Sequence, residues 1–121
     1  MTLQQRLECL AQGVEGALGA ALLGDDGMPL CQWTAGGADP DVEAGWVESL
    51  PVVSLARQAC GPDGGLEALT LQAAGRWTLV SVVDGRHHLV LSLRPGGNAG
   101  KGRYLLRLHA PDFRREVAAL A

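Results

Sequence analysis

The sequence predicts an α+β domain in which three helices cover a five-stranded antiparallel sheet. Three observations predict this class. Stretches with helical periodicity begin, divide and end the chain, stretches rich in β-forming residues lie between them, and short turns join consecutive strands. Such short turns make the joined strands antiparallel. The expected order is helix, strand, strand, helix, strand, strand, strand, helix, within a single domain over residues 1–121.

The composition agrees with one independently folding domain. The chain has 121 residues, of which 47% are hydrophobic and 19% charged. A chain of that length needs neither a disulfide nor a metal to fold, and the apolar content is too high for disorder. Three Trp, one Tyr and one Phe are present against 17 glycines. We therefore expect a core of Leu, Val and Ala, with glycines at the turns.

The first segment predicts a short helix followed by a central strand. Thr2 and Gln5 match a capping box for a helix over 3–12, in which leucines recur at helical spacing. Gly13 is expected to end this helix in the left-handed conformation. Residues 14–23 are apolar on both sides, which predicts a strand covered on both faces, and their small side chains allow a helix to pack closely over it.

Turn signals separate the remaining strands. Asp25-Asp26-Gly27, Ala74-Gly75 and Asp84-Gly85 are dipeptides and tripeptides typical of tight hairpin turns. The strands that they separate are expected at 30–34, 66–73, 76–83 and 86–94.

A second helix is expected between the two groups of strands. Asp39 as N-cap and Pro40 at the first helical position predict its start. Pro51 lacks an N–H group and clashes with the preceding turn, so we expect a kink there or a second segment over 52–60. The pair Gly61-Pro62 is expected to end the helix.

A third helix is expected at the end of the chain, over about 99–109, with a restart at Pro111. The apolar stripe of the restarted part is Phe113, Val117 and Leu120. The preceding segment 96–102 superficially resembles a phosphate-binding loop, but it has Pro95 in place of the first glycine and Gly102 in place of the hydroxyl residue. We interpret it as a turn with Asn98 as the helix N-cap.

The sequence offers no pattern for metal, cofactor or catalysis. His87 and His88 are neighbours on a strand and point to opposite faces, so they cannot share one metal ion. No nucleophile is placed beside a base in a recognisable motif. We therefore predict no metal site, no cofactor and no enzymatic activity.

Cysteine use and segment hydropathy predict a cytoplasmic protein. Cys9, Cys31 and Cys60 are odd in number and widely spaced, which argues against a disulfide framework or a zinc site. We expect all three to be buried and reduced. The first residues lack the pattern of a signal peptide, and the longest apolar stretch is too short for membrane insertion.

Charge is divided between the two halves of the chain. The net charge is −3, with −6 over residues 1–60 and +3 over 61–121. This balance does not indicate a nucleic-acid partner. Basic residues concentrate in the last helix, where they either steer an acidic partner or form an ordinary solvated face. The candidates for partner binding are Arg103, Arg107, Arg114 and Arg115.

The second helix carries more apolar residues than one buried stripe needs, and the strand at 66–73 is a candidate sheet edge. Together they indicate a symmetric dimer, although the apolar residues would equally serve as core. The candidates for the self-interface are Val42, Trp46, Leu50 and Val53, with Leu69 and Leu71.

The order and spacing of several motifs resemble the roadblock/dynein light-chain family. The opening Leu7-x-x-Leu10-x-x-Gly13-Val14-Glu15-Gly16-Ala17-Leu18, the turn Asp25-Asp26-Gly27 and the strand Leu66-Glu67-Ala68-Leu69-Thr70-Leu71 carry the resemblance. Trp77-Thr78-Leu79-Val80, Leu89-Val90-Leu91 and the segment from Gly96 to Gly100 continue it to the end of the chain. Pro51 and Pro111 depart from the usual uninterrupted helices of the family.

The resemblance implies a dimer, with itself or a paralogue, through the second helix and the third strand. It also implies a platform for a Ras-like small GTPase. Bacterial members similar to the gliding-motility regulators can stimulate hydrolysis by rearranging the GTPase's own residues, so the chain would be a non-enzymatic scaffold or regulator. The alternative is a small-ligand sensor or an interaction module in a signalling complex, because antiparallel sheets with flanking helices also form ligand pockets.

Overall fold

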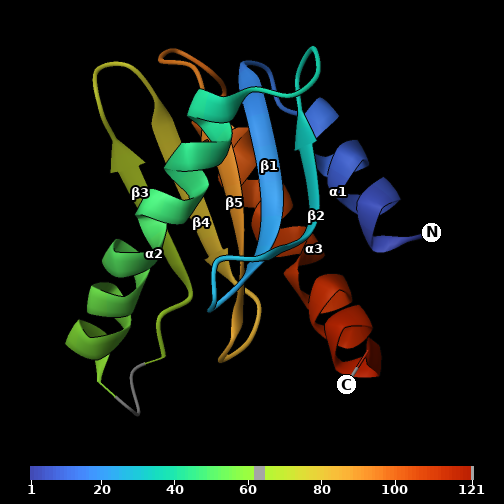
Figure 1. The fold of residues 1–121 in the computed structure, drawn as a ribbon, viewed down its shortest axis with the longest axis vertical. Helices are drawn as coiled ribbons and strands as arrows, with labels where there is room; N and C mark the ends of the chain where they lie inside the picture. The colour runs from blue at the N-terminus through green and yellow to red at the C-terminus, as the bar shows by residue number, and fades with distance from the viewer. Residues whose placement is uncertain (62–64, 121) are drawn as a thin grey trace.

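The computed structural model describes residues 1–61 and 65–120 and shows three helices around one sheet (Figure 1). The elements in chain order are α1 (Leu3–Gln12), β1 (Ala17–Gly24), β2 (Pro29–Thr34), α2 (Pro40–Cys60), β3 (Ala68–Gln72), β4 (Trp77–Val82), β5 (His87–Leu93) and α3 (Ala99–Leu120). This order and the α+β class confirm the prediction from the sequence.

The sheet has the strand order β2-β1-β5-β4-β3, and every neighbouring pair is antiparallel. β1 and β5 form its centre, where Leu22 pairs with Cys31 of β2 on one side and with Leu89 of β5 on the other. The hairpins β1–β2 and β3–β4 lie on opposite sides of β5. β2 and β3 are therefore the two edges of the sheet.

Each face of the sheet has its own apolar core. On one face α1 and α3 cover the strands, and α2 covers the other face (Figure 1). The larger core is built around Leu7, Leu10, Leu22, Leu79, Leu89, Leu91, Leu93, Leu106 and Phe113. The smaller core contains Ala21, Leu23, Val42, Trp46, Val53, Val80 and Val90.

Close packing of α2 on β1 depends on a glycine. A Cβ atom at Gly19 would lie 2.8 Å from Val42 Cγ1 and 3.0 Å from Trp46 Cζ2, closer than side-chain atoms approach. The absence of a side chain at this position therefore lets the helix approach the strand, as the small residues of this segment predicted.

Both internal prolines lie inside continuous helices. α2 runs from Pro40 to Cys60 through Pro51, and α3 runs from Ala99 to Leu120 through Pro111. The predicted second segment over 52–60 and the predicted restart at Pro111 are therefore wrong. Each proline removes one helical hydrogen bond, but both are exposed, so the carbonyl oxygen left without a donor can bind water.

The ends of α1 and α2 differ in how well they were predicted. Thr2 and Gln5 form the predicted capping box. Gly13 has a φ of −77° and donates its N–H to Cys9 and Leu10 carbonyls, so the predicted left-handed ending is wrong. Gly61 caps α2 with a φ of 76°, whereas Pro62 lies outside the described residues.

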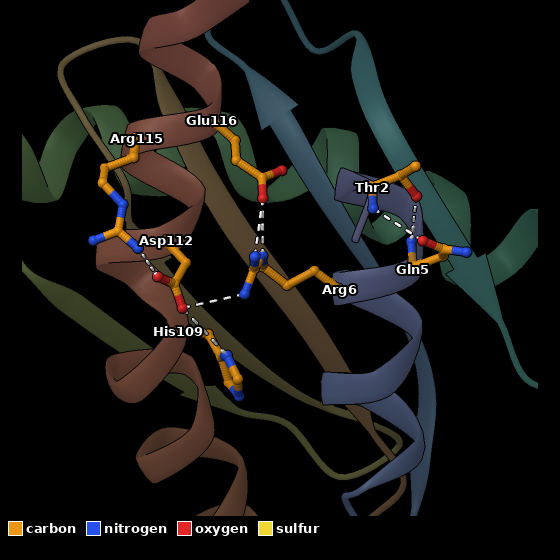
Figure 2. A network of polar contacts seen from close by, with 7 residues as sticks. All are labelled: Thr2, Gln5, Arg6, His109, Asp112, Arg115 and Glu116. Carbon is orange, nitrogen blue, oxygen red and sulfur yellow. Dashed lines mark hydrogen bonds and ion pairs between the residues drawn. The ribbon is translucent and has the colours of Figure 1, made fainter.

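A polar network attaches α1 to α3 (Figure 2). Arg6 of α1 donates from Nη1 to Asp112 Oδ2 at 3.2 Å and from Nη2 to Glu116 Oε1 at 3.0 Å. Arg115 pairs with the other oxygen of Asp112. The two helices that cover one face are thus joined by charges as well as by the core beneath them.

Within residues 1–61 and 65–120, no helix is both long and apolar enough to cross a membrane.

Candidate functional site

The two edges of the sheet differ in what satisfies their backbone groups. At the β2 edge, the side-chain amide of Gln4 donates to the carbonyl of Gln32 at 2.7 Å and accepts from its N–H at 3.3 Å. The carbonyl of Thr34 accepts from Gly37, and Pro29 has no N–H to leave unpaired. The chain therefore closes the middle of this edge by itself.

The β3 edge is open. Leu69 and Leu71 pair with Val80 and Thr78 of β4, and in an antiparallel ladder the alternate residues turn their backbone groups outward. The outward residues are Ala68, Thr70 and Gln72. None of their backbone groups is hydrogen-bonded on the outer side by another residue of the described ranges. An open edge of this kind can pair with a strand from another chain.

The inner face of α2 is part of the core. Val42, Trp46 and Val53 are 4%, 2% and 3% exposed and pack on the sheet in the smaller core. Ser49 completes this stripe, with its hydroxyl donating to the Trp46 carbonyl at 2.6 Å. In the single chain these side chains face the sheet beneath α2 and are covered by it. Their assignment to a self-interface stays a prediction.

The outer face of α2 carries other apolar residues. Val47 and Leu55 are exposed by 54% and 65%, and Val52 is exposed by 37%. Val52 and the half-buried Leu71 of β3 line one groove between helix and strand, which we name the α2 groove. The open edge and the exposed apolar side of α2 therefore lie next to each other.

The remaining predicted interface residues lie in different places. Leu69 and Leu71 are half-buried on β3, beside the open edge. Leu50 is half-buried on the opposite flank of α2, where it approaches the β1–β2 turn at Gly27. Leu55 was not among the predicted residues, although it is one helical turn beyond Val52 and was detectable from that spacing. Gln4 was not predicted either, and the sequence gives no signal for it.

Three of the four predicted partner-binding arginines lie together. Arg103, Arg107 and Arg114 line a groove between α3 and the part of β3 and β4 that faces it, which we name the α3 groove. Arg114 Nε donates to the Val83 carbonyl at 2.7 Å. Arg115 points elsewhere and pairs with Asp112 (Figure 2).

The groups with shifted pKa values belong to the core or to a turn. Burial raises the pKa of the Cys31 thiol to about 11, and Glu116 adds to this effect. Burial lowers the pKa of His88 to about 4, assisted by the charges of Arg57 and His87. An unreactive thiol and a neutral imidazole are the expected consequences at neutral pH.

Asp84 stands in the β4–β5 turn, where it accepts from His87 Nδ1 at 2.9 Å and from the Arg86 N–H at 2.8 Å. Burial opposes its charged form, but these hydrogen bonds outweigh burial and lower its pKa. No cluster of three or more metal-ligating side chains occurs within residues 1–61 and 65–120.

Two further sequence predictions concern the N-cap of α3 and the burial of the cysteines. The Lys101 N–H donates to Asn98 Oδ1 at 3.0 Å, so Asn98 is the predicted N-cap of α3. The prediction that all cysteines are buried is wrong for Cys9 and Cys60, which are exposed, and right for Cys31. Cys9 lies on the solvent side of α1 and Cys60 at the last residue of α2, where no core packing reaches them.

Several solved structures are similar to this chain. Crystalline MglC from Myxococcus xanthus matches 96% of this chain and 99% of its own, at 29% identity and a TM-score of 0.72. The Roadblock/LC7 domain from Streptomyces avermitilis matches 98% and 99%, at 21% identity and a TM-score of 0.80. A structure of MglB with a tetrameric arrangement matches 92% and 84%, at 16% identity and a TM-score of 0.78. Comparisons of the sequence with family models and with curated proteins found no match.

Proposed function

We propose that this chain, which has the roadblock/LC7 fold, is a non-enzymatic dimeric regulator in a small-GTPase system of the cytoplasm. The observation that carries the proposal is the open β3 edge beside the exposed apolar side of α2. The likeness to MglC and to MglB, which is described as a gliding protein in Thermus thermophilus, supports this role over a ligand-sensing one.

The proposed dimer joins two sheets through their β3 strands. In an antiparallel pair related by a twofold axis, the outward N–H and C=O groups of Ala68, Thr70 and Gln72 bond the same groups of the partner. The pairing places the two α2 helices next to each other across the axis. Val52 and Leu55 then cover the partner's apolar residues, together with Leu69 and Leu71.

The edge at β2 supports the choice of β3. Gln4 occupies the backbone groups of Gln32, so a second strand would have to displace two hydrogen bonds there. At β3 the described residues form no outer hydrogen bond that a second strand would have to displace. The chain is therefore biased toward one edge-to-edge arrangement, which gives a closed pair instead of an open filament.

The regulatory role is assigned to surfaces and not to a reacting group. The shifted groups Cys31 and His88 are buried in the core, and Asp84 is bound within a turn. These positions suit stability and not catalysis. We therefore propose that any effect on GTP hydrolysis arises from the way the dimer binds the GTPase and rearranges the GTPase's own residues.

Self-association is tested by sedimentation at micromolar concentration. We expect the wild-type chain to sediment as a dimer and Thr70→Pro as a folded monomer, because proline removes an outward N–H without breaking a bond to β4. Thr70→Val is the matched control and should remain a dimer. Leu55→Asp tests the helix side and should weaken the dimer with little change in the free energy of unfolding of the monomer.

A wild-type monomer would refute the proposed dimer, and so would a Thr70→Pro variant that sediments as the wild type does. Circular dichroism of each variant distinguishes loss of association from loss of folding. The GTPase is tested separately, by titrating the small GTPase encoded nearest to this chain, loaded with a fluorescent GTP analogue or GDP. We expect nucleotide-dependent binding, and equal absence of binding in both states would refute the regulatory role.

A further inference from the structure

We propose that the α3 groove is a docking site for an acidic peptide segment of a partner protein. The groove is formed within one chain, on the face of the sheet opposite to α2. It adjoins the proposed self-interface at β3, where the side chains of Ala68 and Thr70 line the groove and their outward backbone groups pair the strands. Its lining combines a floor of short side chains with a wall of α3 that carries three arginines.

The floor exists because α3 does not cover the β3 edge. Ala68 pairs with Ser81 and Thr70 pairs with Leu79, so these four side chains share the face toward α3. Leu79 and Ser81 are buried, whereas Ala68 is exposed and Thr70 is half-buried. Short side chains on β3 leave a groove of about 700 Å³ between the strand and the helix.

The wall places three positive charges in one row. Arg103, Arg107 and Arg114 are four and seven residues apart, which keeps them on the same side of α3. At 1.5 Å per residue the first two are about 6 Å apart along the helix axis and the last two about 10 Å. Ala110 and Pro111 lie between them and make the middle of the wall apolar.

These charges are left without carboxylate partners inside the described part of the chain. None of the three arginines forms an ion pair with a residue in 1–61 or 65–120. Arg114 uses its Nε to hold the Val83 carbonyl, which fixes its guanidinium at the groove while leaving its charge unpaired. Two acidic residues line the groove. Asp84 is engaged by His87 and Arg86, and Glu67 is exposed just before β3.

The shape and charge together favour an acidic peptide segment. Carboxylates two residues apart on an extended chain are about 7 Å apart, and those four apart on a helix are about 6 Å apart, so either matches the Arg103–Arg107 spacing. Small or apolar residues between the carboxylates would contact the floor and Pro111. A nucleic acid is disfavoured, because the whole chain is net negative at −3.

The test uses a fluorescein-labelled peptide of alternating Glu and Leu, titrated with the full chain and followed by anisotropy. We expect saturable binding that weakens as NaCl is raised. The double variant Arg103→Glu/Arg107→Glu should weaken binding by about tenfold or more, because it replaces two attractive charges with two repulsive ones. Lys101→Glu is the matched control, since Lys101 lies roughly 160° around α3 from Arg103.

A second variant separates shape from charge. Ala68→Trp fills the floor without changing any charge and should also weaken peptide binding. In the wild type, the amide chemical shifts of Ala68, Thr70 and Ser81 should change when peptide is added. Absence of peptide binding would overturn the proposal. Equal weakening by Lys101→Glu would overturn it as well, and so would single-stranded DNA that binds more tightly than the peptide in an Arg103-dependent way.

Discussion

β2 and β3 occupy the two edges of one sheet, but within residues 1–61 and 65–120 only β2 is covered by its own chain. α1 packs beside β2 and supplies Gln4, whose amide imitates a neighbouring strand by both donating to and accepting from Gln32. β3 has no such neighbour among the described residues and is flanked by the α2 groove on one face and the α3 groove on the other. The comparison teaches that a single side chain can decide which edge of a sheet is available.

The largest difference in the free energy of unfolding should appear between a leucine at the centre of the sheet and a leucine at the β3 edge. Leu91 of β5 is fully buried under α1 and α3, and Leu71 of β3 is half-buried. We expect Leu91→Ala to lower the free energy of unfolding by about 3–5 kcal/mol and Leu71→Ala by about 1 kcal/mol or less. Urea titration, at a protein concentration too low for dimerisation, measures both free energies of unfolding. Equal losses would show that β3 is packed as firmly as the centre.

His88 should make the centre of the sheet sensitive to acid. It is 2% exposed and has a pKa of about 4, so between its pKa values in the folded and unfolded states the unfolded chain binds more protons and stability rises with pH. We expect a loss of about 2 kcal/mol in the free energy of unfolding from about pH 7.5 to about pH 5.

The control for this pH dependence is His88→Leu, which should flatten the profile in the same window. A wild-type profile that is flat between these two pH values would contradict the neutral buried state of His88.

The attachment of α1 to α3 should contribute a smaller amount. Arg6 is 20% exposed in its side chain and meets two carboxylates of α3, Asp112 and Glu116. We expect Arg6→Met to cost about 1–2 kcal/mol, between the values for exposed and buried pairs. Arg115→Met removes a 75% exposed partner of Asp112 and should cost less than about 0.5 kcal/mol. A larger loss of stability for Arg115→Met than for Arg6→Met would refute this role of Arg6.

The most direct test of the edge comparison is Gln4→Ala, for which we expect a small effect on stability. Loss of three hydrogen bonds, two to Gln32 and one to Glu8, costs about 1 kcal/mol, partly offset by the better helix propensity of alanine. The opened β2 edge should instead appear as association beyond the dimer in sedimentation. Gln12→Ala, at the exposed end of α1, is the control and should not associate further.

Most of the fold was predictable because local signals and burial agree along the chain. The capping box at Thr2 and the Asp39-Pro40 start are local signals, and α1 and α2 begin where they indicate. The prolines misled the prediction because their cost depends on whether water can reach the freed carbonyl, which a sequence does not show. β1 begins at Ala17 and not at residue 14, because strand pairing with β5 starts there.

The site was less predictable, and α2 shows why. Spacing by four residues selected Val42, Trp46 and Leu50, but the buried stripe turns to Ser49 instead of Leu50. Ser49 is polar and was not a core candidate, yet its hydroxyl is satisfied by the Trp46 carbonyl, so its burial is inexpensive. From apolar content alone, the side of α2 that contains Ser49 cannot be distinguished from the side that contains Leu50.

The pairing of β1 with β5 also bears on the order in which the chain can fold. Leu22 and Leu89 are partners at the centre, although β2, α2, β3 and β4 lie between them in the sequence. Each outer hairpin is local and can form early, but the two cannot become one sheet until β5 joins them, and such distant contacts are slow to close. During synthesis, β1 and β4 therefore each expose an additional edge until residue 93 has been added. Any truncation before β5 should leave two hairpins that aggregate instead of a smaller domain.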